Sequence, residues 1–102
     1  MIGDLDPVIH APKRLAAMAI TANAPHVTFA FLKEQLGISD SDLSKQMSAL
    51  ESAGYVKSTK QGRGRGSRTS YSITRSGRKA YNTHREALRA LLDEAPVSDT
   101  SS

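Results

Sequence analysis

The chain has no cysteine among its 102 residues. This absence excludes disulfide bonds, thiolate metal sites and thiol catalysis. Long apolar runs are also missing. The longest, around Leu15–Ile20, is far too short to cross a bilayer, and the N-terminus has no apolar segment of the kind found in secretory signals. We therefore expect a cytoplasmic protein with no membrane partner.

Acidic residues are absent from the middle of the chain, where none occurs between Glu51 and Glu86. Eight of the fourteen lysine and arginine residues lie in the window 57–79. The net charge of the whole chain is only +4, so the rest of the chain is net acidic. The positive charge is therefore local, which favours a binding face for a polyanion such as nucleic acid.

Two short alternating segments lie within or at the edge of this window, at 55–58 and 70–74. Their period of two predicts a β-hairpin with one buried face. The connecting sequence GRGRGS, 62–67, fits neither phosphate-loop pattern, and it joins two strands rather than a strand to a helix. It suits a loop in which glycine permits close approach while arginine reaches phosphates or a narrow minor groove.

The segment before the hairpin predicts a helix from Ser39 to Gly54. Ser39 is a natural N-cap followed by acidic residues in the first turn. Leu43, Met47 and Leu50 share one face. The opposite face is small and polar with one cation, which would fit a DNA major groove, although alone it could be a solvated face. The polar set is Ser41, Lys45, Ser48 and Ser52, with Ser44 at one side, whereas Gln46 lies near the edge of the apolar face.

Local signals place the remaining elements. Proline at position 12 suits the first turn of a helix, and Asn23–Pro25 ends it. Thr28 and Thr74 can each cap a helix, and Gly37 supplies a tight turn. These signals predict helices over 12–20, 29–36 and 75–94, with a short extended piece at 26–27.

The order of these elements predicts an α+β fold that is mostly α. We expect a winged helix-turn-helix with a three-helix core, a small antiparallel wing sheet and a C-terminal helix. Residues 1–94 would form this single domain, and residues 95–102 a disordered tail.

Nothing in the sequence indicates catalysis or a cofactor. His10, His26 and His84 fall in separate segments without metal-ligand spacing, so we expect no metal site. The serines have no base arranged nearby in sequence, and no acid pair is placed for proton transfer. We expect a protein that is not an enzyme.

The last predicted helix carries an apolar stripe that a small domain cannot easily cover. This stripe favours a homodimer, although the helix could instead pack wholly within its own monomer. The expected interface residues are Leu15, Met18, Tyr81, His84, Leu88 and Leu91.

From Leu5 to Leu92 the chain resembles compact winged-helix transcriptional regulators of the MarR/ArsR-like group. The segments that carry the resemblance are LDPVIHAPKRLAAM, LKEQLGISDSDLSKQMSALESAGYV and RTSYSITRSGRKAY. It implies a recognition helix in the major groove and a wing on the neighbouring backbone or minor groove. The implied contacts are Ser41, Ser44, Lys45, Gln46 and Ser48 for the groove, and Arg63, Arg65 and Arg68 for the wing.

Three family features are missing: the aspartate near the wing, the long C-terminal helix pair of full-length MarR proteins, and the cysteine metal box of ArsR sensors. The type of effector therefore does not transfer. We interpret the chain as a sequence-specific regulator, a repressor, that binds double-stranded DNA as a homodimer on a pseudo-palindromic operator. Two alternatives remain open, a nucleoid-type architectural protein and a winged-helix protein-interaction module.

Overall fold

The computed structural model describes residues 2–62 and 68–94, and it has the winged helix-turn-helix fold predicted from the sequence. The predicted loop at 63–67 and the tail at 95–102 lie outside the described residues. The elements, in chain order, are η1 (Ile2–Asp4), α1 (Pro12–Ala22), β1 (Val27–Thr28), α2 (Phe29–Leu36), α3 (Asp40–Ser52), β2 (Val56–Gln61), β3 (Arg68–Ile73) and α4 (Arg75–Asp93).

The helices begin at the residues that the sequence predicted. Thr28, Ser39 and Thr74 each accept a hydrogen bond from the backbone N–H three residues further on, at 3.1, 3.1 and 2.8 Å. Each side chain thereby satisfies an N–H that the first turn of a helix leaves without a partner. Gly37 ends α2 in the left-handed region, with φ of 63°, and turns the chain from α2 into α3.

The sheet has three antiparallel strands in the order β1-β3-β2. In the hairpin, Val56 pairs with Ile73 at one end and Gln61 with Arg68 at the other. The short strand β1 begins one residue later than predicted, because Val27 pairs with Tyr71 and Thr28 with Ser70. The β1 strand therefore joins the helix-turn-helix to the wing.

The core lies where α1, α2 and α3 meet the inner face of the sheet. Its residues come at helical spacing from α1 and α3, and from one strand face only, as a half-buried sheet requires. The buried apolar residues are Ile9, Ala17, Met18, Val27, Leu32, Leu43, Met47, Leu50, Val56 and Tyr71.

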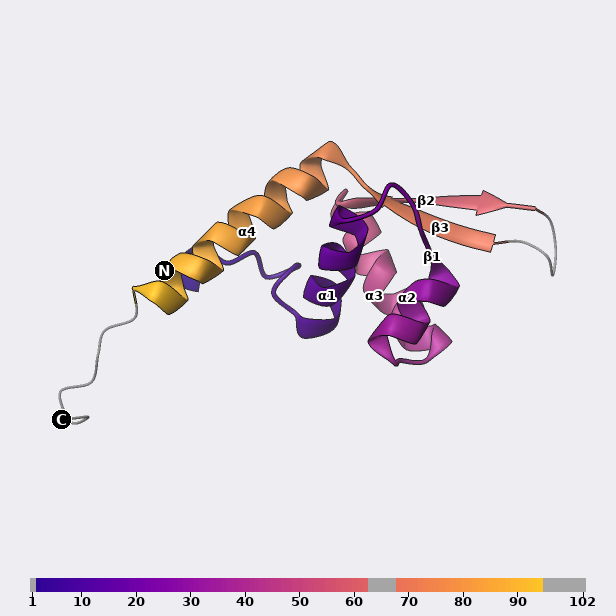
Figure 1. Cartoon of the computed structure of the whole chain (residues 1–102), viewed down its shortest axis with the longest axis horizontal. Coiled ribbons are helices and arrows are strands. Elements are labelled where there is room, and N and C mark those ends of the chain that lie inside the picture. Colours follow the sequence, from indigo (N-terminus) through magenta and orange to yellow (C-terminus); the bar gives the residue numbers. More distant parts are fainter. Residues whose placement is uncertain (1, 63–67, 95–102) are drawn as a thin grey trace.

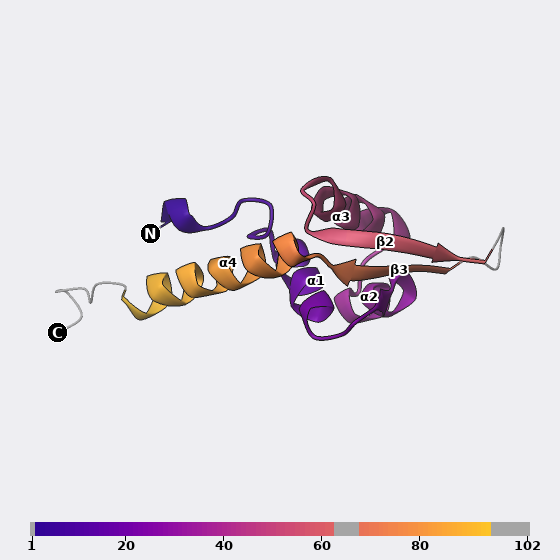
Figure 2. The same cartoon turned by 90° about the horizontal axis from the view of Figure 1, so that it is seen from above.

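Two elements extend away from this helical body in opposite directions (Figures 1 and 2). The β2–β3 hairpin projects on one side, and α4 projects on the other. The N-terminal segment returns along α4, where η1 contacts the helix. None of the helices in the described ranges is long and apolar enough to span a membrane.

Candidate nucleic-acid interface

One face of α3 is exposed and polar. Ser41, Ser44, Lys45 and Ser48 are all exposed, at a spacing of three or four residues that places them on one side of the helix. The opposite side, with Leu43, Met47 and Leu50, is buried. The structure thus brings four of the five predicted groove residues together on one exposed side of α3, where three of the four side chains are those of serine.

Gln46 does not belong to this surface, and its assignment to the groove face is corrected. Its side chain is buried, with only 9% of its area exposed. The amide oxygen accepts a 2.9 Å hydrogen bond from Nη1 of Arg14, and the amide nitrogen donates a 2.9 Å hydrogen bond to Oδ1 of Asp42. Both ends of the amide are therefore engaged inside the protein.

Two cations of α1 fix the orientation of α3 through this contact. Lys13 forms a 2.5 Å ion pair with Oδ2 of Asp42, and Arg14 also donates to the backbone oxygen of Val8. The Lys13 ammonium, together with the Gln46 amide, lowers the pKa of Asp42 below its ordinary value. The charged carboxylate of Asp42 therefore links Lys13 of α1 to Gln46 of α3.

The hairpin presents cations on both of its faces. Lys57 and Arg68 lie on one face and Lys60 on the other, as the strand register requires, and all three are exposed. Lys57 and Lys60 were not among the predicted contacts. Alternation with the buried Val56 could have shown that Lys57 points outward, whereas Lys60 shares the face of Val56 and is exposed only because it lies further along the hairpin. Two predicted wing residues, Arg63 and Arg65, lie outside the described residues.

The base of the hairpin is clamped to the start of α4. Thr74 donates its backbone N–H to the Tyr55 oxygen at 3.0 Å and its hydroxyl to the Gly54 oxygen at 2.6 Å. A Cβ on Gly77 would overlap the Tyr55 backbone, so only glycine permits this close approach. The direction of the wing is therefore coupled to the direction of α4.

A hydrogen-bond network that the sequence did not reveal joins the N-terminal segment to the base of the hairpin and to α4. The Tyr55 hydroxyl donates to Oδ2 of Asp6 at 2.6 Å, which raises the pKa of Tyr55. The backbone N–H of Asp6 donates to Nδ1 of His84 at 3.0 Å, and His10 Nδ1 lies 3.4 Å from His84 Nε2. The only local signal was Asp6–Pro7, where the other oxygen of Asp6 caps the following turn by accepting from Val8 N at 2.9 Å.

These contacts define the chemistry of His84. Because Nδ1 accepts a backbone N–H, the neutral ring carries its proton on Nε2, and this nitrogen donates toward His10. Burial, and then the charge of His10, lower the pKa of His84, while Asp6 acts in the opposite direction. Two histidines that the sequence analysis treated as separate are thus in contact. Within 2–62 and 68–94, no three His, Asp or Glu side chains converge as metal ligands.

The expected interface residues divide into two groups. Leu15, Tyr81, Leu88 and Leu91 are half-buried on α1 and α4, and so retain surface for a partner. Met18 is fully buried in the core and His84 is 1% exposed, so both are corrected as interface residues. The helical phase of α1 turns Met18 inward, and the N-terminal segment covers His84.

Comparison with known proteins gave one family and several similar structures. Residues 13–92 match the winged helix DNA-binding domain family. A transcriptional regulator homologue from Pyrococcus horikoshii OT3 superposes with a TM-score of 0.80 at 24% identity, covering 88% of this chain and 89% of that one. Diamide-treated YodB from B. subtilis gives a TM-score of 0.74 at 15% identity, with coverage of 89% and 88%. A PadR family transcriptional regulator from Eggerthella lenta DSM 2243 gives a TM-score of 0.66 at 21% identity, covering 81% of this chain and 80% of that one.

A search of curated protein sequences found no match. The structural similarities, all below 25% identity, agree on the fold, and the family match extends over α1 to α4. That family is defined by DNA binding rather than by catalysis, as the sequence analysis expected. The chain belongs to the winged helix DNA-binding domain family.

Proposed function

We propose that this protein is a transcriptional regulator that recognises a specific double-stranded DNA sequence by inserting α3 into the major groove. The observation that carries the proposal is the exposed face of Ser41, Ser44, Lys45 and Ser48. A helix with short side chains can approach base edges closely, and hydroxyl and ammonium groups can hydrogen-bond to them. The anchoring of α3 to α1 through Gln46 keeps that face in one orientation.

The β2–β3 hairpin would supply affinity that depends little on sequence. Lys57, Lys60 and Arg68 are exposed, and the acid-free stretch of the chain gives them no competing carboxylate nearby in sequence. We include Arg63 and Arg65 in the same proposed contact on the strength of the sequence alone. Such cations bind phosphates and release counterions, so the binding should weaken as salt increases.

A homodimer is the form we propose for binding. An apolar groove of about 430 Å³ lies between α1 and α4, lined in part by Leu15, Tyr81 and Leu88. Beyond it, α4 extends away from the helical body and carries the exposed Leu92 (Figure 1). A two-fold partner packed on this surface would place two α3 helices about one turn of DNA apart, or about 34 Å, on a pseudo-palindromic site.

A second candidate function rests on a single observation. Lys45 is the only cation on the exposed face of α3 within the described residues, which leaves few groups for reading bases. An architectural protein that binds DNA by charge and shape would have such a face. We favour regulation because the opposite side of α3 is fixed by specific buried contacts, which an unspecific binder would not need.

Selection of bound fragments from a random pool of duplex DNA tests the proposed function. A sequence-specific dimer should enrich one pseudo-palindromic motif, and binding to that motif should exceed binding to random duplex by at least about 10³-fold. A repressor working in the cytoplasm should then block transcription from a promoter that carries the motif. Fragments without a shared motif would favour the architectural function instead.

A further inference from the structure

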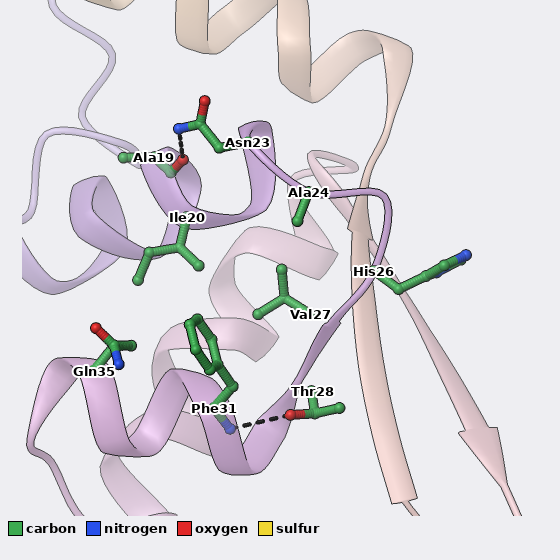
Figure 3. A pocket seen from close by; sticks show the side chains of 9 residues that line it. All are labelled: Ala19, Ile20, Asn23, Ala24, His26, Val27, Thr28, Phe31 and Gln35. Atoms are coloured by element: carbon green, nitrogen blue, oxygen red, sulfur yellow. Dashed lines mark hydrogen bonds between the residues drawn. The ribbon is translucent and has the colours of Figure 1, made fainter.

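A second groove lies on the helical body, between the end of α1, β1 and α2 (Figure 3). Its volume is about 640 Å³. Pockets that hold small organic molecules typically measure roughly 300–1,000 Å³. This groove is separate from the exposed face of α3, and it is larger than the groove between α1 and α4.

The walls of the groove are mostly apolar. Ile20 and Ala24 line it from α1 and the turn after it, while Val27 and Phe31 line it from β1 and α2. The ring of Phe31 is directed toward Ile20 of α1, with Gln35 on one side of it and Val27 on the other (Figure 3). Although it contacts this groove, 47% of Phe31 remains exposed, and only Leu92 shares such exposure among the large apolar residues described. A guest in the groove would cover apolar surface that water now contacts.

The described lining carries no counter-charge for an ion. Among the described residues, no Asp, Glu, Lys or Arg lines this groove, although such residues make up 24% of the chain. Of the lining residues that the structure describes, only His26 has a basic side chain, and its ring points away from Phe31 (Figure 3). A charged guest would lose its hydration without meeting an opposite charge, which is costly. An uncharged guest meets no such penalty.

Besides His26, whose ring points away from Phe31 in Figure 3, one polar side chain of the described lining is available to a guest. Asn23 donates its amide to the Ala19 oxygen at 2.7 Å, and Thr28 uses its hydroxyl to cap α2. Gln35 lies one turn after Phe31 and makes no side-chain hydrogen bond within the part of the chain that the structure describes. Its amide can therefore donate to or accept from one group at the rim of the groove.

The groove contacts both halves of the DNA-binding apparatus. Val27 pairs with Tyr71 of β3, and the next residue, Thr28, caps the first helix of the helix-turn-helix. We propose that the groove binds an uncharged, mostly apolar small molecule with one hydrogen-bonding group, and that the bound molecule changes DNA affinity by altering how α2 and the wing sit on α1. The second half of this proposal rests on the proposed function.

Three probes with one ring system test the site on the free protein. Biphenyl-4-methanol is neutral, whereas biphenyl-4-carboxylate and biphenyl-4-methylammonium carry opposite charges on the same scaffold. In an NMR titration, the alcohol should bind saturably and shift the resonances of Ile20, Val27 and Phe31. Each ion should bind at least about tenfold more weakly, because the groove offers no counter-charge. Absence of saturable binding, or equal binding of all three, would overturn the site.

Variants locate the binding. Phe31→Ala should lower the affinity for the alcohol about tenfold, because it removes the ring that a guest covers. Gln35→Ala should lower it about fivefold, because it removes one hydrogen bond. Leu92→Ala, at the other exposed apolar residue, is the matched control and should not change binding. Thermal unfolding confirms that each variant is folded. If Phe31→Ala instead dissociated a dimer in sedimentation, the groove would be an interface between copies, and the proposal would fail.

DNA binding is measured separately by fluorescence anisotropy on a selected fragment. The alcohol at saturation should change the dissociation constant by at least about fivefold, a coupling of ordinary size. Saturable binding without that change would overturn the regulatory half of the proposal and leave the proposed function standing. A protein that binds the alcohol but shows no DNA binding with or without it would overturn the proposed function and leave the site standing.

Discussion

Arg14 donates a 2.9 Å hydrogen bond to the buried amide oxygen of Gln46, and so ties α1 to the inner side of α3. The other end of the amide binds Asp42, whose carboxylate also pairs with Lys13. Gln46 is therefore a positioning residue for the exposed face of α3 and does not itself reach DNA.

Gln46→Ala should lower the free energy of unfolding by about 1–3 kcal/mol, because it leaves the Arg14 and Asp42 groups with fewer partners in a partly buried place. Urea denaturation measures this loss, and Gln35→Ala, at an exposed glutamine, is the control. DNA affinity should fall more on a selected site than on random duplex, because the base-reading face of α3 loses its fixed orientation. A loss of affinity for the selected site with unchanged stability would mean instead that Gln46 contacts a base.

The close approach of α4 to the hairpin base predicts the effect of a single methyl group. Gly77→Ala would drive a Cβ into the Tyr55 backbone, which cannot move as a flexible side chain could. We expect a loss of stability of about 2–3 kcal/mol or more. Gly3→Ala, where a Cβ would meet nothing within 4 Å, is the control. Equal unfolding midpoints for the two variants would contradict this account of the clamp.

The buried imidazole of His84 predicts a stability that falls in mild acid. The pKa of His84 is lowered in the folded protein, whereas a histidine in the unfolded chain has a pKa of about 6.5. As the pH falls below this value, the unfolded chain takes up a proton before the folded protein does. The contribution of neutral His84 to the free energy of unfolding is therefore fully present above the pKa of the unfolded chain and is lost as the pH falls below it. A second proton would also place an N–H of His84 against the Asp6 N–H. Among the described residues, the charged groups near His84 are the carboxylate of Asp6, which opposes this shift, and those of His10, Asp4, Lys79 and Arg85.

Unfolding curves recorded between about pH 7.5 and pH 5 measure this dependence. This range includes the pKa of a histidine in the unfolded chain, about 6.5, and extends further on its acid side. In His84→Gln the amide oxygen can still accept the Asp6 N–H but cannot titrate, so the curve should become flatter. His26→Gln, at an exposed position, should behave as the wild type does. A wild-type stability that rises as the pH falls would reverse the assigned sign.

The proposed dimer depends on the apolar side of α4. Leu88→Asp would place a charge at the seam between two copies, where its desolvation is unfavourable. The variant should remain folded, sediment as a monomer at micromolar concentration, and bind the selected site much more weakly. Asn82→Asp adds the same charge at an exposed polar position of α4 and should remain a dimer. A wild-type monomer that binds a half-site tightly would contradict the dimer.

The sequence was most informative where structure is determined locally. The caps Thr28, Ser39 and Thr74 and the turn at Gly37 depend on residues within one helical turn, and all four were predicted. The roles of Gln46 and His84 depend on partners 32 and 78 residues away, which no local period reveals. Helical phase placed Gln46 near the edge of the apolar face, the family resemblance assigned it to the groove, and only the Arg14 contact shows that it turns inward.

The central claim is that the exposed face of α3 reads DNA sequence, and Lys45→Ala tests it most directly. The measurement is the dissociation constant of the wild type and of the variant, each on the selected motif and on random duplex at one salt concentration. The account predicts a loss that is larger on the motif by about 1–3 kcal/mol, the value of a base-edge contact. Equal losses on the two DNAs would make Lys45 a backbone contact and would contradict sequence reading by α3 through this residue.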